Sequence, residues 1–323
     1  SNININIQFY GVVSPSSVFF LPMLICSAKK SPPYYHNLMR WLGKCHSGLA
    51  VTVADSQCSG SSSPTEVSPS GPFLVRSVYK AKSSSDKMYL ITLTWRNSHK
   101  PMITIHDTAT GSDCSYQLKR KLGTMVCGFH DSNVELIWDF SRASYNGSPE
   151  PAEEFCLTVI VDSETTLVLG GRDEAVSVKN QKAIYSSLVS RSEYFSRNRV
   201  YSTRVRFFSS GSVHSLTIKY VGEDERSGDL AVSVCMDEKR IFQVERLKWN
   251  FRGNQTIFVD GLLIDMMWDL HDWLFELSSN GCAVFLFRTR DEMDSSRLWM
   301  EDKNLMMTEE KANEFSLLIC VSR

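Results

Sequence analysis

The chain has 323 residues, of which 42% are hydrophobic and 22% charged, which excludes a disordered protein and fits an ordinary globular one. Its 35 basic and 36 acidic residues leave a net charge of -1, so no overall field attracts nucleic acid or anionic lipid. The nine cysteines include no C-x-x-C pair, which argues against a disulfide framework and a metal site, and favours an intracellular, cytoplasmic or nuclear location.

Changes in composition along the chain predict its domain organisation. The amino-terminal part is rich in Ser, Asn and Pro and cannot build a core, and its apolar run at 18–26 is too short to be a transmembrane segment. We therefore expect five segments: a poorly ordered tail at 1–72, a first β unit at 73–170, a connector with a short helix at 171–199, a second β unit at 200–290, and a C-terminal extension at 291–323.

Short alternating runs fill the body of the chain. The segments 89–95 and 102–105 alternate apolar and polar residues between Ser, Asn, Gly and Asp turns, which is the pattern of β-strands joined by hairpins. Helical patterns are confined to a short stretch at 173–182 and a charged stretch at 291–311. The predicted fold class is all-β and sandwich-like, with one or two short helices.

The two halves of the body repeat one another in order. A Trp-Asp pair occurs at Trp138-Asp139 and again at Trp268-Asp269, each after an alternating strand with an acid three residues before the Trp. The earlier strands of the halves match as well, with offsets that drift between 122 (200 − 78) and 130 (268 − 138) in the loops. We interpret this as an internal duplication, which would form either one large sandwich or two stacked ones.

The hairpins that lead into the tryptophans differ in the sequence pattern. In the second half the turn falls at Asp260-Gly261, a pair that favours a tight type I′ turn. In the first half a longer turn at 130–133 is expected. Two extra turn residues would then account for the change in offset from 132 (256 − 124) to 130 (268 − 138).

Longer motifs resemble a plant family of unknown function, DUF868. They are Trp138-Asp139-Phe140 with Ser148-Pro149-Glu150-Pro151, the stretch 198–204, the stretch 249–261 (WNFRGNQTIFVDG) and 268–275 (WDLHDWLF). The resemblance spans roughly 73–290 and is stronger in the second half. It implies a plant protein but brings no activity, cofactor or site residue.

Acidic residues near the Trp-Asp motifs are the candidates for chemistry. If Asp139 and Asp269 converged with His271, they could act as acid and base on a glycosidic bond. The simpler interpretation is that each Asp accepts hydrogen bonds from the turn that follows its strand. No nucleophile elbow, metal-ligand spacing or cofactor motif accompanies them.

Other polar residues are candidates for contact with a ligand or partner. Arg252 and Asn254 flank Gly253, where a bend or an anion-binding nest is conceivable, and His271 is followed by Asp272 and Trp273. Five tryptophans, at positions 95, 138, 249, 268 and 273, alternate with aliphatic residues and are expected to fill the core.

Arg204 and Arg206 lie on one strand face and could form a basic stripe, although nucleic-acid signatures are missing. The sequence thus favours a binding or interaction module that recognises a protein partner and has no catalytic activity. The alternatives are a carbohydrate hydrolase that uses Asp139, Asp269 and His271, and a lipid- or membrane-surface module. The copies differ most at 252–254 and 271–273, which is where a specific function is expected.

Overall fold

The computed structural model describes residues 69–97, 100–129, 132–171, 186–221, 230–276, 281–290 and 315–322. These residues form 17 strands in three sheets and a single short helix, α2 (His271–Phe275), so the all-β prediction is confirmed. The predicted helices at 173–182 and 291–311 lie outside the described residues. In the described part of the chain, no helix is long and apolar enough to cross a membrane.

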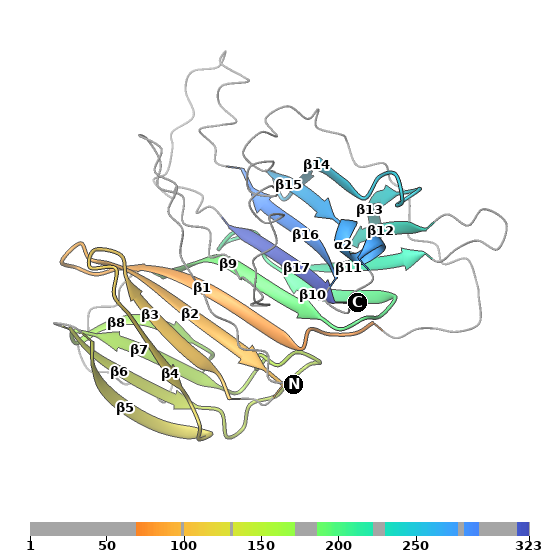
Figure 1. Ribbon diagram of the computed structural model, residues 1–323. Helices are drawn as coiled ribbons and strands as arrows, with labels where there is room; N and C mark the ends of the chain where they lie inside the picture. The colour runs from red at the N-terminus through yellow and green to blue at the C-terminus, as the bar shows by residue number, and fades with distance from the viewer. Residues whose placement is uncertain are drawn as a thin grey trace, which may run out of the picture. The chain divides into compact units, whose positions relative to one another are not determined.

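The largest sheet has nine strands and runs through the molecule from β4 to β14 (Figure 1). Its pairs are antiparallel except β17 with β9. In spatial order its strands are β14 (Arg252–Val259), β15 (Leu262–Asp269), β16 (Cys282–Thr289), β17 (Ser316–Ser322), β9 (Ser186–Phe195), β1 (Leu74–Lys82), β2 (Met88–Arg96), β3 (Met102–Asp107) and β4 (Asp113–Gln117).

Two smaller sheets of four antiparallel strands complete the fold. The first contains β5 (Leu122–Phe129), β6 (Ser132–Asp139), β7 (Cys156–Val161) and β8 (Glu164–Leu169). The second contains β10 (Val200–Val205), β11 (His214–Val221), β12 (Ala231–Met236) and β13 (Lys239–Val244).

The buried apolar residues form two separate cores. One core is built from β1–β8 and includes Trp95 and Trp138, and the other is built from β9–β17 and includes Trp268. Each core therefore lies between a four-stranded sheet and four strands of the large sheet. We call these the first sandwich (β1–β8) and the second sandwich (β10–β17). Of the two arrangements left open by the sequence, the structure has two sandwiches that share one sheet.

Both cores lie on the same face of the large sheet, as the strand registers establish. Trp95 pairs with Val75, Val75 with Glu193, Glu193 with Ile319, and residues directly opposite in a sheet point to the same side. Trp95 and Val75 belong to the first core and Ile319 to the second. Glu193, which is fully buried, occupies the same face between them.

The strand that joins the sandwiches comes from a segment expected to be a connector. β9 lies within 171–199, and β17 lies within the expected C-terminal extension at 291–323; both are central strands of the large sheet. The sequence pattern does not reveal β9 as a strand, because β9 carries polar residues, among them Arg191 and Glu193, at positions that face the cores. An ion pair inside the fold brings the charges of Arg191 and Glu193 together, and no local pattern reveals it.

Candidate functional site

The two Trp-Asp motifs sit in closely matched surroundings. Gly123 pairs with Trp138 and Gly253 pairs with Trp268 in the same antiparallel register. Each indole N–H donates to a main-chain carbonyl of the loop before the hairpin, Trp138 to Arg120 at 2.9 Å and Trp268 to Asn250 at 3.1 Å. Both indole N–H groups are thus bonded to the main chain inside the protein.

The paired glycines are needed for space. A Cβ added to Gly123 would lie 2.7 Å from Cζ2 of Trp138, and one added to Gly253 would lie 2.1 Å from Cζ2 of Trp268. The stretch 252–254 of β14 pairs regularly with β15, so neither the predicted bend nor a nest occurs there. Gly253 does not have a positive φ. Packing against Trp268, rather than backbone freedom, requires a glycine at this position.

The two hairpins have equal lengths. Phe129 pairs with Ser132 and Val259 pairs with Leu262, so each turn contains two residues. The prediction of a longer turn at 130–133 is wrong. It rested on an alignment of Thr124 with Thr256, whereas equivalent residues of the two hairpins are 130 apart throughout. The prediction for the second turn is confirmed, since Asp260 and Gly261 both have positive φ, as a type I′ turn requires.

Asp139 and Asp269 each bind the turn that follows their own strand. Asp139 Oδ1 accepts from the backbone N–H of Ser141 at 2.8 Å, and Asp269 Oδ1 accepts from that of His271 at 3.0 Å. Asp269 Oδ2 also accepts from Arg252 Nε at 2.8 Å. Asp139 lies in the first small sheet and Asp269 in the large sheet, at the ends of equivalent strands in different sandwiches. Both carboxylates thus have local structural partners.

Partly exposed aromatic rings gather beside the second motif. The rings of Phe251, His271 and Phe275 are in mutual contact, with centroids 5.3 to 5.5 Å apart, and the Arg252 guanidinium lies 5.6 Å from the Phe251 centroid. Trp249 precedes them in the turn that begins at Arg246. We call these three rings, together with Trp249, which lies two residues before Phe251 in the sequence, the aromatic cluster.

Exposure sets the aromatic cluster apart from the other tryptophan sites. Trp249 is 82% exposed and Phe275 is 47% exposed, whereas Trp95, Trp138 and Trp268 are buried. The prediction that all five tryptophans fill the core is therefore wrong for Trp249. The signal that could have identified it is its position between Lys248 and Asn250, in a polar stretch without strand alternation.

The remaining sequence candidates are distributed over several surfaces. His271 Nδ1 lies 3.0 Å from Asp272 Oδ1, so both are beside the aromatic cluster. Trp273 instead packs on the second core and stacks on Tyr220 at 4.6 Å. Asn254 is exposed on β14, and Arg204 and Arg206 are both exposed at the end of β10, as expected for a shared face.

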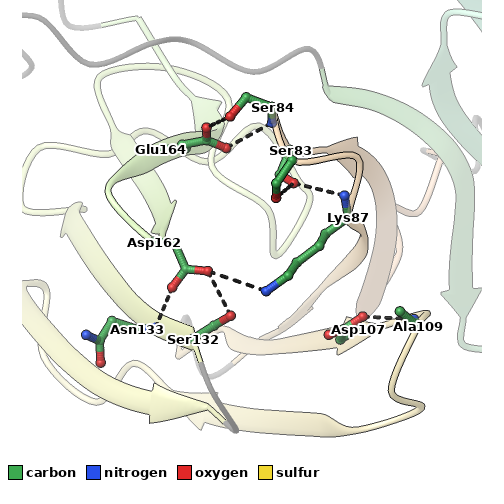
Figure 2. A network of polar contacts seen from close by, with 10 residues as sticks. Ser83, Ser84, Lys87, Asp107, Ala109, Ser132, Asn133, Asp162 and Glu164 are labelled. Carbon is green, nitrogen blue, oxygen red and sulfur yellow. Dashed lines mark hydrogen bonds and ion pairs between the residues drawn. The ribbon is translucent and has the colours of Figure 1, made fainter.

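A polar network holds the turns at the end of the first sandwich that lies opposite the Trp138-Asp139 motif. Figure 2 shows Asp162, from the β7–β8 turn, accepting from Ser132 Oγ at 2.8 Å and from the Asn133 backbone N–H at 2.9 Å, with Lys87 Nζ 4.0 Å away. Glu164 accepts from Ser84 of the β1–β2 turn. These contacts tie hairpins of the two facing sheets together, so Asp162 and Glu164 have a structural role.

A histidine plays the same role in the second sandwich. His214, at the start of β11, lies 2.5 Å (Nδ1) from Asp237 Oδ2 and 2.9 Å (Nε2) from Asp260 Oδ2. Burial opposes protonation of the ring, but the hydrogen bonds to the two aspartates outweigh it and raise the pKa of His214. The contact with His214 in turn lowers the pKa of Asp260 and, against the effect of burial, that of Asp237. No sequence motif marks this group, because three separate hairpins contribute to it.

No group of three or more His, Cys, Asp or Glu side chains within the described ranges could hold a metal ion. The fold and its sites define an all-β protein of two sandwiches with an aromatic surface on the second. The chain belongs to the family described as plant protein of unknown function (DUF868), whose model matches residues 70–323. Comparisons with curated proteins and with solved structures returned no match.

Proposed function

We propose that this plant protein is a non-catalytic interaction module that binds a protein partner through the aromatic cluster of the second sandwich. The observation that carries the proposal is the exposure of Phe275, whose ring contacts Phe251 and His271, and of Trp249, which lies two residues before Phe251 in the sequence. Trp, Phe and Arg are enriched in the energetically dominant parts of protein interfaces. Large rings held at the surface by neighbouring rings lose little side-chain freedom when a partner covers them.

The local charge favours a protein over nucleic acid or lipid. The side chain of Arg252 is paired with Asp269, and that of His271 lies beside Asp272, so the cations next to the rings have acidic neighbours. Phosphate binding draws its strength from cations that replace counterions. Arg204 and Arg206 are exposed, but two arginines make a small basic surface for a membrane. Burial of apolar rings is therefore the main source of affinity that this surface offers.

The acidic residues support the non-catalytic part of the proposal. Hydrolysis of a glycosidic bond needs two carboxyl groups that reach one substrate from opposite sides. Asp139 and Asp269 lie in different sandwiches, and each accepts hydrogen bonds from the turn that follows its own strand. We accordingly assign both residues to the support of these turns.

The test compares partner capture by the wild type with that by a double variant, Trp249→Ser with Phe275→Ser. A matched control is Phe258→Ser. Phe258 is 60% exposed and lies on β14, the strand after Trp249, but its ring is not one of those in contact with His271. We expect a protein from plant extract that binds the wild type and the control. With that protein purified, titration calorimetry should give an affinity at least about 30-fold weaker for the double variant. Equal affinity of the wild type and the double variant would refute the proposal.

A further inference from the structure

The edge strand β5 has a free side that is ready to pair with another strand. Of the described strands, only β6 pairs with β5, which ends the first small sheet. The backbone N–H of Phe140 donates to the carbonyl of Lys121, so in this ladder the odd-numbered residues of β5 bond to β6. The N–H and C=O groups of Leu122, Thr124 and Val126 therefore point toward the free edge.

The side chains on this edge lack the usual protection against pairing. Leu122 is 60% exposed and Val126 is 70% exposed, and Thr124 between them is exposed as well. β5 contains no charged residue and no proline, which are the devices that natural edge strands use to prevent association. Leu122, Thr124 and Val126 therefore form an exposed, uncharged stretch of this edge, and Lys121 directly precedes it.

The equivalent strand of the second sandwich shows the contrast. At the offset of 130, Arg252 and Asn254 of β14 stand in place of Leu122 and Thr124. Arg252 is held in an ion pair with Asp269, which places a charge at this edge. The same framework thus has one edge strand with a charge inside it and one whose nearest charge is Lys121, just before the strand, so the apolar character of β5 is not imposed by the fold.

We propose that β5 pairs with β5 of a second copy of this chain in an antiparallel, two-fold symmetric dimer. In the register centred on Thr124, Thr124 faces its own counterpart, and Leu122 of each copy faces Val126 of the other. The free N–H and C=O groups of these residues then bond to one another, because residues of the same parity meet. The exposed side chain of Leu122 in each copy is then covered by that of Val126 in the other copy.

Self-complementarity is the reason for a second copy as the occupant. A two-fold interface uses one surface twice, so a strand must match its own reverse. The sequence Leu-x-Thr-x-Val does so, with a β-branched residue at the axis and an aliphatic pair on either side. No like charges meet within β5. Because a single strand pair buries little area, the dimer is expected to be weak and concentration-dependent.

Cysteine cross-linking tests the register. In Thr124→Cys the two thiols would sit on directly opposite residues, whose Cα atoms are about 5.5 Å apart, within the range of a disulfide. In Val126→Cys the two thiols would be four residues out of register, about 13 Å apart along the strands. Under mild oxidation we expect a covalent dimer of Thr124→Cys and none of Val126→Cys or the wild type. Equal cross-linking of the two variants, or none of Thr124→Cys, would overturn this register.

Sedimentation velocity of the full chain tests the dimer itself. The wild type should shift from monomer to dimer as its concentration rises, and Leu122→Lys with Val126→Lys should remain monomeric. Unchanged thermal unfolding of that double variant at low concentration would establish that it is folded. The aromatic-cluster variant should still dimerise, which separates this inference from the proposed function. A wild-type chain that stays monomeric because another segment or protein occupies β5, or a dimer that survives both lysines, contradicts the proposal.

Discussion

The first sandwich and the second sandwich have the same framework and different surfaces. In both, four strands of a small sheet face four strands of the large one, and a Gly–Trp pair is followed by an Asp that accepts from the next turn. At the offset of 130, however, Lys119 and Lys121 stand where Trp249 and Phe251 stand. The comparison teaches that a few packing contacts maintain the framework, while the surrounding positions are free to acquire a binding surface. Common descent of the two halves stays a prediction.

The two sandwiches meet at an ion-pair group that Arg191 and the fully buried Glu193 of β9 form with Glu150. Arg191 Nε lies 2.6 Å from Glu193 Oε1, and Arg191 Nη2 lies 2.6 Å from Glu150 Oε2 in the β6–β7 loop. Although burial disfavours the charged guanidinium, Glu150 and Glu193 outweigh it and raise the pKa of Arg191. This group holds a loop of the first sandwich against the strand that leads to the second.

Removal of this ion-pair group should have the largest effect on stability. Arg191→Met leaves the fully buried Glu193 without its cation, so we expect a loss of about 3–5 kcal/mol in the free energy of unfolding, measured by urea denaturation. The second variant, Arg191→Met with Glu193→Gln, should recover part of this loss because it also removes the buried negative charge. A single variant as stable as the wild type would show that the ion pair does not join the sandwiches.

The paired glycines test whether the frameworks are equally tight. Gly253→Ala and Gly123→Ala should each cost about 1–3 kcal/mol, because the new methyl group meets the indole ring of Trp268 or Trp138. The cost should be greater at Gly253, where the added Cβ would approach to 2.1 Å, than at Gly123, where it would approach to 2.7 Å. Thermal melts of both variants provide the comparison, and Gly128→Ala, where nothing lies within 4 Å, is the control. The reverse order would contradict the packing.

The turn end of each sandwich should respond differently to pH. His214, Asp237 and Asp260 form the group in the second sandwich, whereas an aspartate, a lysine and hydroxyl groups form it in the first. The pKa of His214 is raised, so its contribution is complete below its unfolded pKa of about 6.5 and is lost as the pH rises through the folded value. The lowered pKa values of the aspartates preserve their contribution above about pH 4, and it is lost as the pH falls through the folded values.

His214→Gln should therefore destabilise the protein most near pH 5–6, by about 1 kcal/mol, since the group is partly open to solvent. The difference from the wild type should shrink as the pH is raised toward 9. Urea denaturation across this range measures it. The control is Asp162→Asn in the first sandwich, where no histidine is among the contacts of Asp162. A deficit of His214→Gln that did not change with pH would exclude an ionised histidine.

Much of the framework was predictable because it depends on local patterns. Alternation predicted the all-β class, the Asp260-Gly261 pair predicted its turn, and the repeated Trp-Asp pairs predicted equivalent strands. The candidate site was predicted only in part. His271 and Arg252 were chosen because they differ between the copies, but Trp249 was assigned to the core and is exposed, whereas Trp273, a contact candidate that was also expected in the core, packs on the core. Periodicity reports which face a residue occupies and does not report whether a neighbouring loop covers that face.

The sequence by itself determined the strand content, the matching order of the two halves and the family, since short-range alternation and motif spacing carry that information. Only the tertiary structure decided that two sandwiches share a sheet, that β9 and β17 join them, and that His214 meets two aspartates. Each of these features depends on contacts between residues far apart in the chain, such as Glu193 with Val75 and Ile319. Such contacts are selected by burial and charge pairing in three dimensions, which leave no periodic signal along the chain.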